Sequence, residues 1–175
     1  DDVKKEWKLK RDMEKRGYTR HEVMEEIQKR QADYHRYIAP QREYADAVIH
    51  IGFSRYGRDL GWQKNIYQTT LAQIPFSDDL PRTDLALNLP ALMTLIPGQF
   101  SLSYSRLILG GRTLASLTFD GEFDCHFISG LRDLFSGDAG VSPCQILGER
   151  DMLTAPDVVR AMLAWRIIQD IISEQ

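Results

Sequence analysis

Residues 101–109 and 112–119 predict an antiparallel β-hairpin. Both runs are strand-like, and only Gly110 and Gly111 separate them. Two adjacent glycines between two such runs are a strong signal for a two-residue turn, because both central residues of that turn need a positive φ. A second turn is predicted at Asp120-Gly121. The chain must therefore contain a sheet whose apolar face is covered by other elements.

Helical periodicity and end signals predict the elements on either side of this hairpin. Residues 2–16 contain few helix breakers and stop at Gly17, which suits the position after a helix end. Thr19 and Glu22 have the spacing of a capping box, in which each side chain caps the backbone of the other. The predicted elements are helices over 2–16 and 19–34, strands over 45–51 and 84–89, the hairpin, and a closing helix over 156–172 with a wide apolar stripe.

Length and composition indicate a soluble globular chain of one domain, or of one domain and part of another. The 175 residues are 43% hydrophobic and 27% charged, which is close to the average for such proteins. No run approaches the roughly 20 apolar residues that cross a bilayer, and the N-terminus lacks the apolar core of a signal peptide. We therefore expect a cytoplasmic protein with no membrane partner. Cys125 and Cys144 lie outside any CxxC spacing and are expected to be idle thiols.

Positive charge is concentrated near the N-terminus. The net charge is −3, but residues 4–16 hold seven basic and three acidic side chains, a local excess of four positive charges. On a helix, Lys8, Asp12 and Arg16 fall on one face, with Arg11 and Lys15 beside them. Such a cluster suits phosphate, because lysine and arginine neutralise its charge and arginine adds a planar fork of donors. A ladder of exposed ion pairs on a solvated helix face is the structural alternative.

Other chemistry finds little support in the sequence. The histidines, His21, His35, His50 and His126, are scattered, and no Ser or Cys has the setting of a nucleophile. We expect no metal site and no nucleic-acid partner. The motif GxxxxGK[ST] does not occur in the 175 residues. A P-loop kinase holds nucleotide phosphates with that loop, so this chain is not expected to bind ATP by itself.

Three segments together resemble the phosphoribulokinase family. They are the stretch WKLKRDMEKRGYT at 7–19, the stretch YIAPQ at 37–41, and the stretch YADAVI at 44–49. The family has a K-I-x-R-D-M-x-x-R-G-[HY] helix, a second helix, and a Y-I-x-P-Q-x-x-Y-A-D-x-V-I stretch at nearly the same intervals. The run LTFDGEFD at 117–124 is similar to the family's L-x-x-D-G-x-F-D, whereas residues 52–100 are only loosely similar. Uridine kinases share the first helix and the strand, but typically have Pro-Thr-Lys where this chain has Pro40-Gln41-Arg42.

The resemblance implies a fold class, α/β, as the C-terminal part of a P-loop kinase fold. It would be a mixed sheet with two N-terminal helices, a β-hairpin and a closing C-terminal helix. Residues 1–51 would end the kinase core, and residues 52–175 would form the C-terminal sheet and a dimerisation region. By the same resemblance Lys8, Arg11 and Arg16 would bind phosphate, and Asp12 would be the catalytic residue that organises the site.

The resemblance also implies an activity and partners. The parent protein would transfer the γ-phosphoryl group of ATP, with Mg, to a sugar phosphate such as ribulose 5-phosphate, and would form a homodimer. The P-loop half of the family lies outside this sequence, so the chain alone is expected to be inactive and to bind no cofactor. Ile96-Pro97-Gly98-Gln99 lacks the nearby regulatory cysteine of photosynthetic members, which argues against thioredoxin-type control. A non-catalytic, kinase-derived dimerisation or regulatory module is the alternative, as is a uridine-kinase-like enzyme.

Overall fold

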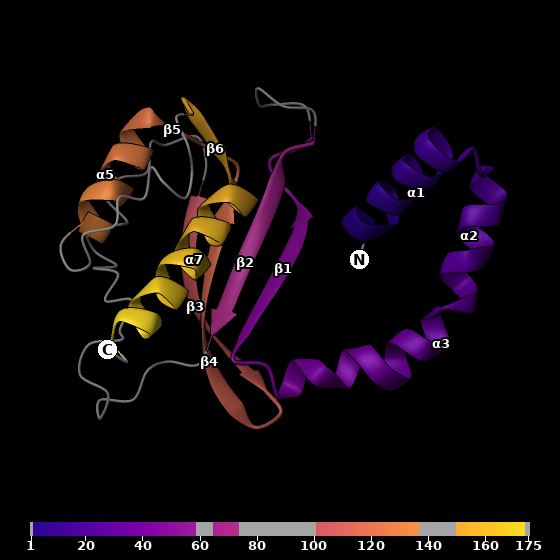
Figure 1. Cartoon of the computed structure of the whole chain (residues 1–175), viewed down its shortest axis with the longest axis horizontal. Coiled ribbons are helices and arrows are strands. Elements are labelled where there is room, and N and C mark those ends of the chain that lie inside the picture. Colours follow the sequence, from indigo (N-terminus) through magenta and orange to yellow (C-terminus); the bar gives the residue numbers. More distant parts are fainter. Residues whose placement is uncertain (1, 59–64, 74–100, 137–149, 174–175) are drawn as a thin grey trace.

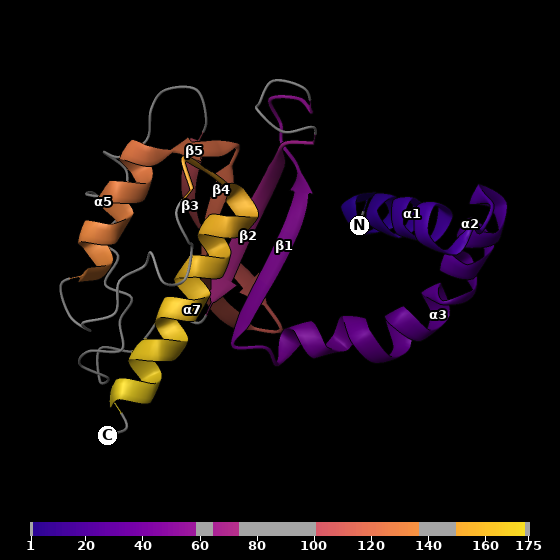
Figure 2. The same ribbon diagram turned by 45° about the horizontal axis from the view of Figure 1, so that its top comes forward.

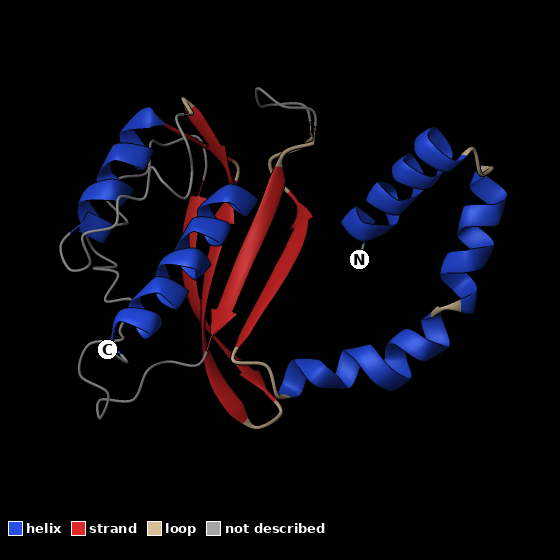
Figure 3. Ribbon diagram, viewed as in Figure 1, coloured by secondary structure: helices blue, strands red, loops and turns tan. Residues whose placement is uncertain are grey.

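The structure is a computed structural model that describes residues 2–58, 65–73, 101–136 and 150–173. An arm of consecutive helices precedes a body in which helices lie beside a sheet (Figures 1 and 3). The arm consists of α1 (Asp2–Arg16), α2 (Arg20–Lys29), α3 (Gln31–Asp33), a π-helical turn (Tyr34–Ile38) and a 3-10 turn (Ala39–Glu43). The body consists of β1 (Ala47–Phe53), β2 (Tyr67–Gln73), β3 (Ser101–Leu109), β4 (Arg112–Asp120), β5 (Glu122–Asp124), α5 (Cys125–Ser136), β6 (Met152–Thr154) and α7 (Ala155–Ser173).

The end signals of the first two helices act as predicted. Gly17 follows α1 with a φ of +72°, in the left-handed region that glycine tolerates. At the start of α2 the backbone N–H of Glu22 donates to the Thr19 hydroxyl (3.3 Å), and the backbone N–H of Thr19 donates to the Glu22 carboxylate (2.7 Å). The capping box is therefore confirmed. The regular part of α2 ends at Lys29, and the chain continues to Glu43 in less regular turns that carry Pro40.

The predicted hairpin is confirmed as β3 and β4. Leu109 lies opposite Arg112, and the two glycines between them have φ values of +56° and +76°. Positive φ at both positions is the signature of a type I′ turn, whose twist matches that of the strands it joins. The strand predicted over 45–51 is observed as β1, shifted by two residues. The strand predicted over 84–89 lies outside the described residues.

The main sheet differs from the mixed sheet that the resemblance implied. Its order is β1-β2-β4-β3, and each of the three neighbouring pairs described is antiparallel. A parallel pair needs a crossover connection, usually a helix, whereas antiparallel neighbours do not. The short strands β5 and β6 form a second antiparallel pair. Because β1 pairs with β2, the sheet crosses the predicted boundary at residue 51; the division into 1–51 and 52–175 stays a prediction.

Helix α7 lies across one face of the sheet (Figures 1 and 2), and the core includes residues of both. Val158, Met162 and Trp165 on α7 are buried in the same cluster as Leu117 and Phe119 of β4. The predicted closing helix is thus confirmed, and it packs within this chain. Fully burying one such side chain contributes about 1.5–3 kcal/mol of transfer free energy. None of the helices in the described part is both long and apolar enough to span a bilayer.

The D-G-E-F-D stretch at residues 120–124 makes hydrogen bonds and core contacts that hold the body together. Asp120 is fully buried and accepts hydrogen bonds from Gln68 Nε2 (3.1 Å) and the backbone N–H of Arg55 (3.4 Å), while Arg55 Nε lies 3.3 Å away. Phe123 is a core residue. The Asp124 carboxylate accepts from the backbone N–H groups of residues 126 and 127 at the start of α5. This motif therefore joins the end of β4 to β2, to the turn after β1, to the core and to a helix start.

Candidate functional site

Helix α1 brings Arg11 and Arg16 to one carboxylate, that of Asp12. The Asp12 side chain is fully buried, and its Oδ1 lies 2.8 Å from Arg11 Nε and 3.3 Å from Arg16 Nη1. The two arginine side chains remain 53% and 56% exposed, so both are accessible from solvent. The predicted convergence of these two residues is therefore observed. They form a pair of exposed guanidinium groups oriented by a buried anion.

The electrostatics of Asp12 favour the ionised carboxylate. The hydrogen bond from Arg11 holds the pKa of Asp12 below its usual value, and the charges of Arg11, Arg16 and Lys8 act in the same direction against the effect of burial. In return, Asp12 raises the pKa of Arg11. The second oxygen, Oδ2, is buried and has no hydrogen-bond partner within the described residues. Such an oxygen retains acceptor capacity for a donor that enters the site.

Lys8 has a different partner from the two arginines. Its Nζ lies 3.4 Å from Glu26 on α2, and Glu26 also pairs with Arg30 at 2.8 Å. Lys8 thus forms an ion pair that joins α1 to α2. Glu26 was not predicted, because it lies 18 positions from Lys8 and no local spacing joins them. The sequence-predicted cluster is therefore one arginine pair on Asp12 with Lys8 beside it.

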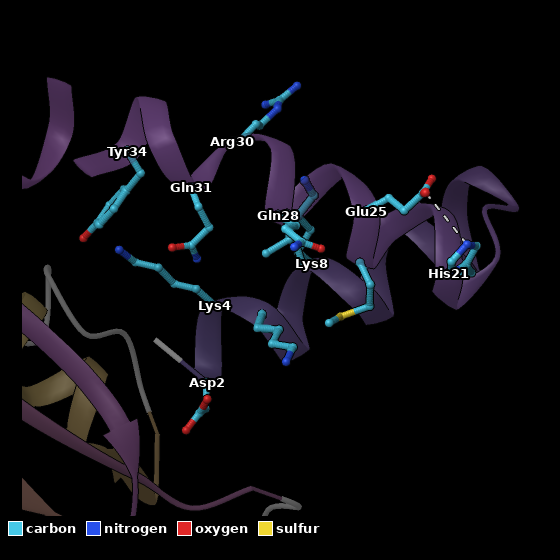
Figure 4. A pocket seen from close by; sticks show the side chains of 12 residues that line it. Asp2, Lys4, Lys8, His21, Glu25, Gln28, Arg30, Gln31 and Tyr34 are labelled. Carbon is cyan, nitrogen blue, oxygen red and sulfur yellow. Dashed lines mark ion pairs between the residues drawn. The ribbon is translucent and has the colours of Figure 1, made fainter. Parts of the chain in front are cut away.

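A cavity of about 690 Å³ opens between α1 and α2, with Lys8 on its wall. Its lining combines lysine stems with the apolar side chains of Met24 and Ile27. Figure 4 shows Lys4 pointing toward Tyr34 at one end of this cavity, and Lys4 Nζ lies 5.8 Å from the centre of the Tyr34 ring. At the other end of the cavity His21 Nε2 lies 3.8 Å from Glu25 Oε1. The cavity is basic and partly apolar, which suits an anion with an organic body.

Contacts far apart in sequence attach α1 to the body. Trp7 Nε1 donates to the Tyr67 hydroxyl (3.0 Å), and the two rings meet edge to face with centroids 5.7 Å apart. Glu6 pairs with Arg58. These contacts place the basic helix beside the ends of β1 and β2. Within the described residues no group of three or more His, Cys, Asp or Glu side chains comes together as a metal site would require.

Comparisons with known proteins match the N-terminal part of the chain. A stretch of 51 residues in this chain is 43% identical to the phosphoribulokinase of Synechocystis sp.. It is 44% and 42% identical over 50 residues to the chloroplastic phosphoribulokinases of Mesembryanthemum crystallinum and Arabidopsis thaliana. Each alignment covers 29% of this chain but only 13–15% of the relative, so the chain matches a small part of those proteins. Residues 1–55, which contain the Arg11–Asp12–Arg16 cluster, match the phosphoribulokinase/uridine kinase family, and the resemblance is confirmed for that segment.

Proposed function

We propose that this chain is part of an ATP-dependent pentose-phosphate kinase resembling phosphoribulokinase, which converts ribulose 5-phosphate to ribulose 1,5-bisphosphate. The observation that carries the proposal is the pair of exposed guanidinium groups held by one buried carboxylate inside the matched segment. Phosphoryl transfer depends mainly on positioning and on stabilising negative charge, and oriented arginines supply both.

In this proposal Arg11 and Arg16 bind phosphate oxygens, and Lys8 adds charge from the neighbouring bridge. Asp12 acts through the arginines. Because its side chain is fully buried and both guanidinium groups lie on its Oδ1, its task in this proposal is to orient those donors. We therefore propose a positioning role for Asp12 in place of the catalytic role that the family motif implied.

ATP and magnesium would be held outside the described residues. The described part of the chain brings no three carboxylate or histidine side chains together, and the sequence has no GxxxxGK[ST] loop. These residues do not fit a nucleotide–magnesium site, so the proposal assigns that task to a separate nucleotide-binding half. What this chain contributes is sugar-phosphate or nucleotide-phosphate binding.

Binding measurements test this role. Isothermal titration of the 175-residue chain with ribulose 5-phosphate should show binding that Arg11→Ala weakens at least about tenfold, the value of one charge-assisted hydrogen bond. Arg42→Ala removes an exposed arginine outside the cluster and should leave the affinity within about twofold. Equal affinities for wild type and Arg11→Ala would reject the assignment. The native protein at its full cellular length should form ADP from ATP when ribulose 5-phosphate is supplied.

A non-catalytic dimerisation or regulatory module is the second candidate. Exposed apolar side chains favour it: Ile108 on the sheet-edge strand β3 is 74% exposed, and Ile167 on α7 is 58% exposed. A full-length native protein that dimerises but forms no ADP with ribulose 5-phosphate or uridine would support this candidate over both kinase assignments.

A further inference from the structure

We propose a second anion-binding site, for a small phosphate monoester, between α1 and the turn that follows β1. A cavity of about 560 Å³ lies there, and its lining includes Lys5, Lys10, Arg20 and Arg58 together with Phe53. None of these residues belongs to the Arg11–Asp12–Arg16 cluster. The site is therefore independent of the proposed kinase function.

Helix α1 supplies five of the residues that line this second cavity. Residues 2, 5, 6, 9 and 10 all line this cavity and have the i, i+3, i+4, i+7, i+8 spacing of one helix face. Asp2 and Lys5 also line the cavity between α1 and α2, whereas Lys10, Arg20 and Arg58 line only this one of the two cavities. The resemblance assigns roles to Lys8, Arg11 and Arg16, so Lys5 and Lys10 are basic residues of α1 that it does not use.

More basic than acidic side chains line the cavity. Four cations line it against two carboxylates, Asp2 and Glu6, an excess of two positive charges. Within the described residues the side chains of Lys5, Lys10 and Arg20 make no ion pair or hydrogen bond, so their charges remain available. A phosphate monoester carries close to two negative charges near pH 7, since its second pKa is about 6. The charge of such an ester matches that of the cavity.

Contacts with neighbouring residues already orient the Arg58 side chain. Arg58 Nε donates to Asn65 Oδ1 (3.0 Å), its guanidinium carbon lies 4.1 Å from the centre of the Phe53 ring, and it pairs with Glu6. An arginine held by stacking and by hydrogen bonds loses less freedom when it binds an anion than a free side chain does. Phe53 and Leu9 add an apolar wall for the organic part of the ligand. A monoester with an apolar or aromatic body thus fits better than inorganic phosphate.

Titration with phenyl phosphate and with inorganic phosphate tests the site. The 175-residue chain should bind phenyl phosphate more tightly than inorganic phosphate. Lys10→Ala/Arg20→Ala should weaken phenyl phosphate binding at least about tenfold. The matched control, Lys29→Ala/Arg42→Ala, removes the same two charge types from exposed positions outside the cavity and should change the affinity less than about twofold. Circular dichroism confirms that each variant remains folded.

Each opposing outcome would overturn the proposal. Absence of binding, or equal losses in both double variants, would show a solvated basic surface. A loss in Arg11→Ala alone would place the ligand at the first cluster. Co-sedimentation with phosphatidylglycerol vesicles that Lys10→Ala/Arg20→Ala abolishes, without binding of phenyl phosphate, would assign the surface to lipid headgroups in place of a soluble ester.

Discussion

At the scale of single residues, Asp12 determines what the basic helix can do. An isolated buried carboxylate is unfavourable, and the two guanidinium groups on Oδ1 offset that cost. Asp12 in return orients the two arginines, whose side chains remain more than half exposed. The motif is therefore built around one buried carboxylate and differs from a ladder of weak surface ion pairs.

The lowered pKa of Asp12 predicts a pH dependence of stability. Its pKa is depressed in the folded chain, chiefly by the hydrogen bond from Arg11, whereas an unfolded aspartate titrates near about 3.9. A depressed folded pKa contributes stability above the unfolded value, and that contribution is lost as the pH falls through the folded value. Thermal unfolding of the wild type should therefore lose more stability below about pH 4 than that of Asp12→Asn.

The control for this experiment is Glu14→Gln, which neutralises an exposed carboxylate on the same helix. Its unfolding midpoint should follow the wild-type pH profile. Parallel profiles for wild type and Asp12→Asn would contradict a pKa lowered by the arginines.

At the scale of elements, turn chemistry specifies how the strands pair. Gly110 and Gly111 both have positive φ, so a side chain at either position is strained. Their surroundings differ, because a Cβ on Gly110 would lie 3.1 Å from Glu43 Cβ, while a Cβ on Gly111 would meet nothing within 4 Å. The hairpin turn thus touches the end of the helical arm at one glycine only.

This difference predicts unequal effects of two matched substitutions. Gly111→Ala should lower the free energy of unfolding by about 1–2 kcal/mol, the backbone cost of a left-handed alanine. Gly110→Ala should lower it further, because the new methyl group also displaces Glu43. Urea unfolding of both variants measures the difference. Equal losses would show that the Glu43 contact adjusts freely.

At the scale of the whole molecule, the chain buries one side of its sheet by itself and leaves other apolar surface exposed. Leu114 and Trp165 are buried within one chain. The strand β3 forms one edge of the sheet, and Tyr104 and Ile108 on it are 47% and 74% exposed. An exposed sheet edge with apolar side chains is a template for pairing with another strand.

We therefore predict a homodimer that uses the β3 edge. Sedimentation equilibrium at micromolar concentration should show a dimer for the wild type and a monomer for Ile108→Lys, since a lysine on an edge strand opposes edge-to-edge pairing. Arg42→Lys, on the arm, serves as the control and should remain dimeric. A strictly monomeric wild type would reject this prediction.

Local signals in the sequence determined the elements whose contacts lie close along the chain. The end of α1 at Gly17, the capping box at Thr19 and the hairpin turn each depend on neighbours a few residues apart, so propensity and spacing were sufficient to predict them. The basic helix was predicted for the same reason. Its assignment to a kinase family came from the resemblance and not from periodicity.

Only the tertiary structure decided which distant residues meet. The antiparallel order β1-β2-β4-β3, the bond from Arg55 to Asp120 across 65 positions, and the bond from Trp7 to Tyr67 across 60 positions leave no periodic trace in the sequence. The burial of Asp12 is of the same kind, because helical spacing places a residue on a face but does not say what covers that face. Strand order and burial depend on packing between elements, and that packing determines which charges of α1 become paired and which stay available for a ligand.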